Sequence, residues 1–66
     1  MKRLPTRREL EVLAYLSRGL TRQMTADAMS LASGTVDQHA WEARMKLRAK
    51  NDTHACCEAL RRGLIT

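Results

Sequence analysis

Apolar residues recur along this chain at spacings of three and four, in segments separated by short polar or glycine-containing stretches. That spacing places apolar side chains on one face of an α-helix. With starts taken from capping residues and ends from glycine or polar turns, the pattern predicts four helices, over residues 6–18, 21–30, 34–48 and 52–62. We therefore expect an all-α fold in a single domain that covers residues 1–66.

The first predicted helix has clear boundaries. Thr6 and Glu9 form the Thr-x-x-Glu pattern of a capping box, in which each side chain bonds a backbone N–H of the other residue. Leu10, Leu13 and Leu16 follow at helical spacing, and Gly19 is a C-terminal stop. The second predicted helix starts at a cap residue, and its cap and apolar positions are Thr21, Met24, Ala28 and Met29.

The third predicted helix has two faces of different character. Its apolar positions form a narrow stripe that permits close packing: Val36, Ala40, Ala43 and Leu47. Winding the helix at about 100° per residue places the following residues on the outer side: Asp37, Gln38, Trp41, Arg44, Met45 and Arg48. An exposed aromatic such as Trp41 indicates a surface that contacts a partner.

The fourth predicted helix, capped by Asp52 and ended by Gly63, has an apolar arc wider than one core face needs. The arc comprises Ala55, Cys56, Ala59 and Leu60, with Cys57 at its edge. Two interpretations remain open: the surplus contacts a second copy of the chain, or a short terminal helix is simply well buried.

Composition supports the all-α prediction and limits the function. Nine Ala and nine Leu stand against two Val, one Ile and no Phe, a poor set for a β-sheet. A chain of 66 residues buries too little surface to enclose a deep pocket, and it has neither a spaced catalytic triad nor a Gly-rich phosphate loop. We expect no enzymatic activity and no cofactor. The net charge of +5 suits a phosphate-bearing partner.

The cysteines and the N-terminus indicate an intracellular protein. Cys56 and Cys57 are adjacent, so they do not staple a secreted fold. With His54 they supply no second pair of ligands, and no metal site is expected. The basic start, Met1-Lys2-Arg3, is followed by more charge rather than by the apolar stretch of a signal peptide. The longest apolar run covers five residues, 12–16, which is too short to span a membrane.

Two helices joined by a tight turn and followed by a longer third helix form the helix-turn-helix plan. The sequence also resembles the LuxR/FixJ type of helix-turn-helix domain, which includes free-standing GerE-like proteins. The matching positions run through most of the chain: residues 6–13, Gly19, Ala26, Thr35-Val36, His39, Lys46-Leu47, residues 53–55 and residues 59–65. The ending, residues 51–65, is most similar to the quorum-sensing branch.

This resemblance implies a bacterial transcription regulator that binds double-stranded DNA as a dimer. The third helix would enter the major groove, the fourth would form the dimer contact, and larger relatives recruit RNA polymerase. A cytoplasmic location at the nucleoid follows. The expected dimer residues are Cys56, Cys57, Leu60 and Leu64.

The expected DNA-contacting residues fall into two groups. The base-reading face comprises Asp37, Gln38, Trp41 and Met45. Helix N-termini bind anions through free N–H groups. The residues expected to contact phosphate therefore lie at the starts of the second and third predicted helices and further along the third: Thr21, Arg22, Gln23, Ser33, Thr35, His39, Arg44 and Arg48. A solvated face is the alternative for Arg44 and Arg48, and His39 is expected at the margin of the core.

Several positions depart from the family pattern. Asp37 and Trp41 stand where relatives usually have Lys or Arg, Thr25 where Ile is usual, and Ala32 where a capping Ser or Thr is usual, with Ser33 as a substitute cap. Losing two base contacts per subunit removes about 4–12 kcal/mol in a dimer. That is comparable to the whole margin of specific binding, about 4–10 kcal/mol.

Two functions are therefore in view. The first is a DNA-binding regulator, either free-standing or excised from a longer protein, that reads an unusual site. The second is an antagonist that pairs with a full-length LuxR-type activator and yields an inactive heterodimer.

Overall fold

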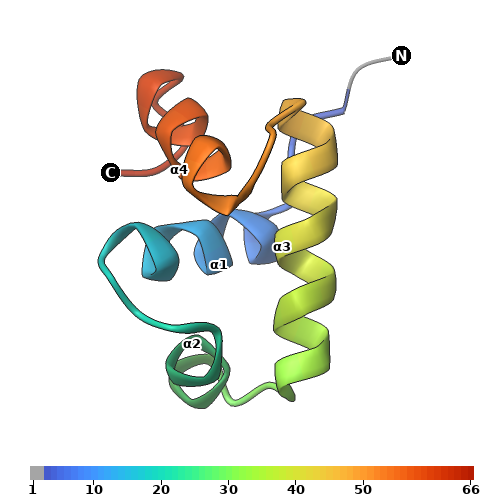
Figure 1. Cartoon of the computed structure of the whole chain (residues 1–66), viewed down its shortest axis with the longest axis vertical. Coiled ribbons are helices and arrows are strands. Elements are labelled where there is room, and N and C mark those ends of the chain that lie inside the picture. The colour runs from blue at the N-terminus through green and yellow to red at the C-terminus, as the bar shows by residue number, and fades with distance from the viewer. Residues whose placement is uncertain (1–2) are drawn as a thin grey trace.

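The computed structural model describes residues 3–66 as four helices: α1 (Arg7–Ser17), α2 (Arg22–Met29), α3 (Ser33–Leu47) and α4 (Asp52–Arg61). No strand occurs in this range, so the all-α prediction is confirmed. Met1 and Lys2 of the basic start lie outside the described residues. α3 is the longest helix, and α4, α1 and α2 lie beside it with α1 between the other two (Figure 1).

Side-chain caps set the starts of α1 and α2 where the sequence predicts them. The Thr6 hydroxyl accepts a bond from the Glu9 N–H at 3.2 Å, and the Glu9 carboxylate accepts one from the Thr6 N–H at 2.9 Å. The capping box is therefore confirmed. Thr21 caps α2 by accepting from the Met24 N–H at 3.1 Å. Gly19 has a φ of +93°, a left-handed conformation that favours glycine and turns the chain from α1 toward α2.

Two predicted caps are wrong. Asn51, not Asp52, caps α4: its side-chain oxygen accepts from the His54 N–H at 2.8 Å, so Asp52 is the first helical residue and its carboxylate is available elsewhere. Ser33 does not cap α3, because the Ala32 carbonyl already accepts the first helical bonds and the helix begins at Ser33. The N-terminus of α3 has no side-chain cap.

The core consists of two clusters on either side of α1. One joins α1, α3 and α4 around Leu13, Leu47 and the small residues of α4. The other joins α1, α2 and α3 around Val12 and Val36. The predicted inner stripe of α3 is buried throughout, at 0–2% exposure: Val36, Ala40, Ala43 and Leu47.

α2 buries a different face from the one its methionines suggest. Thr25 and Ala26 are fully buried, whereas Met24 is 50% exposed. The Thr25 hydroxyl donates to the Thr21 carbonyl at 2.8 Å, which satisfies this polar group inside the core. A threonine therefore fills a site where an aliphatic residue was expected, without an unpaired hydroxyl.

A buried ion pair joins α1 to α3. Lys46 Nζ donates to both carboxylate oxygens of Glu9, at 2.9 and 3.2 Å, and Glu9 is only 5% exposed. Burial raises the pKa of Glu9, but hydrogen bonds from Lys46 and Thr6 outweigh it, and the net pKa is lowered. Glu9 thus serves two elements, as capping residue of α1 and as counter-ion of α3.

None of the helices between residues 3 and 66 has the length and apolar character needed to cross a bilayer.

Candidate nucleic-acid interface

The outer side of α3 lies in solvent, as its sequence pattern predicts. Trp41 and Met45 are 50% and 44% exposed, and Asp37, Gln38 and Arg48 are exposed as well. Arg44 is half-buried. Because α3 packs with its opposite stripe, this outer face is a continuous surface available to a ligand.

Asp37 is not an isolated carboxylate on that face. Its Oδ1 accepts from Arg22 Nη1 at 2.7 Å, and the second terminal nitrogen of Arg22 bonds the Asp52 carboxylate. Arg22 opens α2, Asp37 lies one turn into α3, and Asp52 opens α4. The hydrogen bonds to Asp37 and Asp52 raise the pKa of Arg22. We call these three residues the Arg22 network.

The two glutamines of the expected interface also have partners within the chain. Gln38 donates to Glu42 at 3.0 Å on α3, and Gln23 donates to Asp27 at 3.2 Å on α2. Both pairs are exposed and four residues apart, where such bonds stabilise a helix by only a few tenths of a kcal/mol. A base edge or a phosphate competes with them at little cost.

A shallow hollow of about 350 Å³ lies beside Trp41. It is lined by Arg22, Gly34, Asp37, Gln38, Trp41, Arg44 and Asp52. Gly34 forms an open part of it, since a Cβ at this position would meet no atom within 4 Å. Arg44 lines the same hollow, and its Nε is buried without a hydrogen-bond partner. The hollow thus combines an aromatic surface with two guanidinium groups and two carboxylates.

The remaining residues expected to contact phosphate differ in how accessible the fold leaves them. Ser33 and Thr35 are exposed on the first turn of α3, where N–H groups face solvent. Thr21 is exposed too, but its hydroxyl is engaged as the cap of α2. His39 is half-buried and close enough to Glu9 to help lower its pKa, so it lies toward α1 rather than on the outer face.

Within the described part of the chain, Arg44 of α3 and Arg48, the C-cap of this helix, have no acidic partner. Every acid of the chain is bonded within residues 3–66, either to a basic residue or to a glutamine. Arg44 and Arg48 are in none of the ion pairs of this range. Arg48 has a φ of +56° as the C-cap of α3 and ends the outer face.

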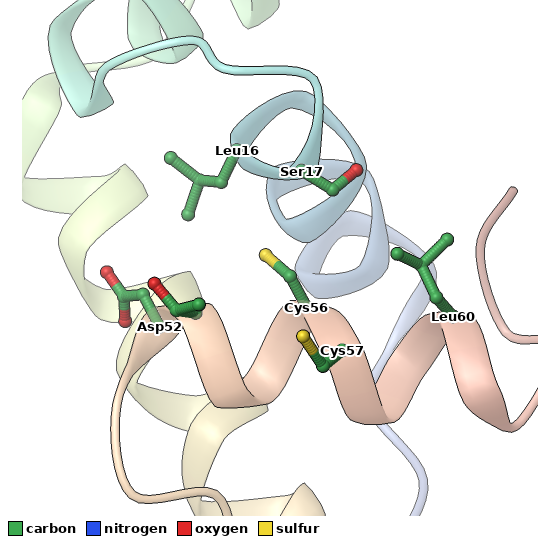
Figure 2. Close-up of a pocket in the computed structure, with 7 residues that line it drawn as sticks. Leu16, Ser17, Asp52, Cys56, Cys57 and Leu60 are labelled. Carbon is green, nitrogen blue, oxygen red and sulfur yellow. The ribbon is translucent and has the colours of Figure 1, made fainter.

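A second hollow lies between α1 and α4, on the side expected to form the dimer. It measures about 390 Å³ and is lined by Leu16, Ser17, Asp52, Thr53, Cys56, Cys57 and Leu60. Figure 2 shows Leu16 and Ser17 on α1 and the other labelled side chains on α4, with the Cys56 sulfur directed toward α1. We call this hollow the α1–α4 groove.

The wide apolar arc of α4 is divided between core and surface. Ala55, Cys56 and Ala59 are buried, and the Cys56 thiol donates to the Leu13 carbonyl at 3.5 Å. Burial raises the pKa of this thiol. Cys57 is exposed, as is Leu60 at 46%, and Leu64 is half-buried. Burial therefore accounts for the inner part of the arc, and contact of the exposed part with a second copy stays a prediction.

Among residues 3–66, no group of three or more His, Cys, Asp or Glu side chains is placed to hold a metal ion.

Sequence reasoning missed the role of Asp52 and the pairing of Asp37. Residues 22, 37 and 52 are separated by 15 residues at each step, and no helical period relates residues on three different helices. Opposite charge was the one available signal, and with seven acids and twelve bases it allows many pairings. Only the packing of the helices selects this one.

Four helices, with the outer face of the long α3 left exposed, are the arrangement of a helix-turn-helix domain. Residues 5–59 match the family model GerE, described as bacterial regulatory proteins of the luxR family. The chain belongs to this family. The family comprises DNA-binding transcription regulators, so DNA is its expected partner. No curated protein matches the chain in a sequence comparison.

Proposed function

We propose that this chain binds double-stranded DNA as a two-fold dimer, with α3 in the major groove, and regulates transcription from the bound site. The observation that carries the proposal is the exposed outer face of α3, since that helix is otherwise fully packed by its opposite stripe. α3 measures about 22 Å at 1.5 Å per residue over its 15 residues, and the major groove admits an α-helix.

The base-contacting residues are Asp37, Gln38, Trp41 and Met45. Two of these four are apolar, so contact with thymine methyl groups contributes more here than a bidentate arginine contact would. Gln38 exchanges its bond to Glu42 for a base edge. The site is therefore rich in A·T pairs opposite Trp41 and Met45.

The phosphate contacts come from both sides of α3. Arg44 and Arg48 supply charge along the helix, and Ser33 and Thr35 supply hydroxyl and backbone donors at its start. Thr21 and Gln23 contribute at the start of α2. Arg22 lies among them, with its charge offset by Asp37 and Asp52. His39 contacts phosphate only at the edge of the interface, because it is half-buried.

The dimer contact is the α1–α4 groove with the exposed part of α4. Leu60 and Cys57 supply its exposed apolar surface, Leu64 extends it, and Cys56 forms its floor. Two copies related by a two-fold axis bury this surface against each other and present two α3 helices to successive turns of DNA. The protein acts in the bacterial cytoplasm, at the nucleoid.

Fluorescence anisotropy with duplex DNA at several salt concentrations tests this function. We expect binding at low salt, with log affinity falling steeply as log salt rises, and a stoichiometry of two chains per duplex site. Arg44→Gln together with Arg48→Gln should reduce the salt slope by about 1.8 per protomer. Absence of binding even at low salt would contradict the proposal.

The antagonist remains a second candidate, in which the chain pairs with a full-length regulator of the quorum-sensing type. The observation that favours it is the Arg22 network, which leaves the expected phosphate contact Arg22 neutralised. The exposed Leu60 of α4 supplies apolar surface for the partner. This function predicts co-purification with a LuxR-type activator, lost in Leu60→Asp but retained in Arg44→Gln. A chain that associates only with itself would exclude it.

A further inference from the structure

The Arg22 network joins two helices that do not otherwise pack on each other. α2 packs on α1 and α3, α4 packs on α1 and α3, and the backbones of α2 and α4 do not approach one another within residues 3–66. The bond from Arg22 to Asp52 spans this gap over a sequence distance of 30 residues. It therefore connects the DNA-facing start of α2 to the helix that lines the α1–α4 groove.

The network carries more negative than positive charge. One guanidinium bonds two carboxylates, and the sum of +1 and −2 is −1. A phosphate gains affinity from a basic side chain whose charge is uncompensated, because binding then releases a condensed cation from the DNA. Arg22, at the start of the helix expected to cross the phosphates, is therefore the one interface arginine whose charge is already compensated by the protein.

Asp52 is the more constrained of the two acids. Its side chain is 31% exposed, against 55% for Asp37, and screening by water weakens the more exposed pair. Asp52 also lines both hollows of the molecule, the one beside Trp41 and the α1–α4 groove. A single carboxylate on α4 thus has contact with the reading face and with the surface proposed for the dimer.

We propose that Asp52 is a negative determinant of DNA affinity that acts through Arg22, by holding this arginine in an internal ion-pair network that competes with phosphate. Asp37 assists it from α3. Asp52 touches no DNA in this arrangement, so it is a positioning residue. The inference depends on the proposed DNA-binding function, because the competitor it names is a DNA phosphate.

The test measures affinity and salt slope for the 66-residue chain with a pool of 30-base-pair duplexes of random central sequence. Phosphate contacts dominate binding to such a pool. Asp52→Asn should raise the affinity about three- to tenfold at low salt and steepen the slope by up to about 0.9 per protomer, the contribution of one phosphate contact. Asp52→Glu, which keeps the charge, should restore the weaker binding.

A double-mutant cycle with Arg22→Gln separates this mechanism from simple repulsion. If Asp52 acts through Arg22, Asp52→Asn has little effect once Arg22 is replaced. Glu42→Gln is the matched control, because Glu42 lies on α3 and bonds Gln38 rather than a basic residue. It should change the salt slope far less than Asp52→Asn. Circular dichroism of each variant checks that the four helices remain.

Each outcome decides the question. The inference would be overturned if Asp52→Asn raised the DNA affinity equally with and without Arg22, or did not raise it at all. The proposed DNA-binding function would still stand in that case, provided that the wild-type chain binds DNA. If no variant binds duplex DNA at low salt, the function and the inference both fail. If Asp52→Asn fails to fold, Asp52→Ser in the same cycle decides the matter, with the same expected direction.

Discussion

The Glu9–Lys46 pair and the Arg22 network are both ionic links between helices, but they differ in burial. The Glu9 and Lys46 side chains are 7% and 17% exposed, whereas the members of the Arg22 network are 31–55% exposed. Buried charges must remain paired, because an unpaired one has no solvent to replace its partner. Exposed charges exchange partners readily. The first link therefore holds the fold, whereas the second is weak enough for a phosphate to compete with it for Arg22.

The largest effect should come from breaking the buried pair. Glu9→Ala leaves the Lys46 ammonium half-buried without a counter-ion and removes one half of the capping box, so we expect the free energy of unfolding to fall by about 3 kcal/mol. Urea denaturation followed by circular dichroism measures it. Replacing both residues, as Glu9→Leu with Lys46→Met, should cost much less. A loss below about 1 kcal/mol in Glu9→Ala would show that the pair behaves as a surface pair.

Acid should weaken the same pair by protonating Glu9. The pKa of Glu9 is lower in the folded chain than its ordinary value of 4.5. The pair therefore contributes stability that is fully present above that value and is lost as the pH falls through the folded pKa. Unfolding curves between about pH 6 and pH 3 should show this loss for the wild type. Glu9→Gln should flatten that part of the profile, and an unchanged slope would argue against the buried pair.

Breaking the exposed network should have a smaller effect on stability. Arg22→Gln removes two ion pairs that are partly screened by water, so we expect the free energy of unfolding to change by at most about 1 kcal/mol. The same urea titration measures it. A loss as large as that of Glu9→Ala would mean that the Arg22 network is required for the fold, and would remove the contrast between the two links.

The smallest expected effect is a preference for thymine over uracil, caused by the apolar residues of the outer face of α3. With Asp37 engaged by Arg22, Trp41 and Met45 dominate the outer face, and each thymine methyl that they cover is worth about 0.8 kcal/mol. Each covered methyl should make an alternating A·T duplex bind roughly fourfold more tightly than the same duplex with uracil in place of thymine. Competition anisotropy measures the ratio.

Trp41→Ala should reduce that preference to the part contributed by Met45, and Met24→Ala is the matched control. Met24 is as exposed as Trp41 but lies on α2, so its replacement should leave the thymine preference unchanged. Equal binding of both duplexes by the wild type would exclude methyl reading, whatever the total affinity.

Local signals accounted for most of the fold. The capping box at Thr6 and Glu9, the cap at Thr21 and the glycine at position 19 depend on residues no more than four apart, so they can be recognised from the sequence and appear as expected in the structure. The caps of α3 and α4 were misassigned by one residue, because Ser33 and Asp52 have side chains that can cap a helix and the local pattern does not fix the exact first residue of either helix.

The exposed side of α3 could be predicted from the sequence, but the buried face of α2 could not. Helical winding placed Asp37, Trp41 and Met45 on the outer side of α3, where they are exposed. It did not show that Thr25 and Ala26, rather than Met24, form the inner face of α2. A short helix with few apolar residues has no single apolar face in its sequence. The face that it buries therefore depends on the space left between the neighbouring helices.

The helices, the inner stripe of α3 and the family of the chain could be predicted from the amino-acid sequence, because they depend on residues close together in the chain or on a recurring motif. The neutralisation of Lys46 inside the core and the sharing of Arg22 by two carboxylates became visible only once the helices were packed. An ion pair depends on the distance between two charges in space, and the packing of helices far apart in the chain sets that distance.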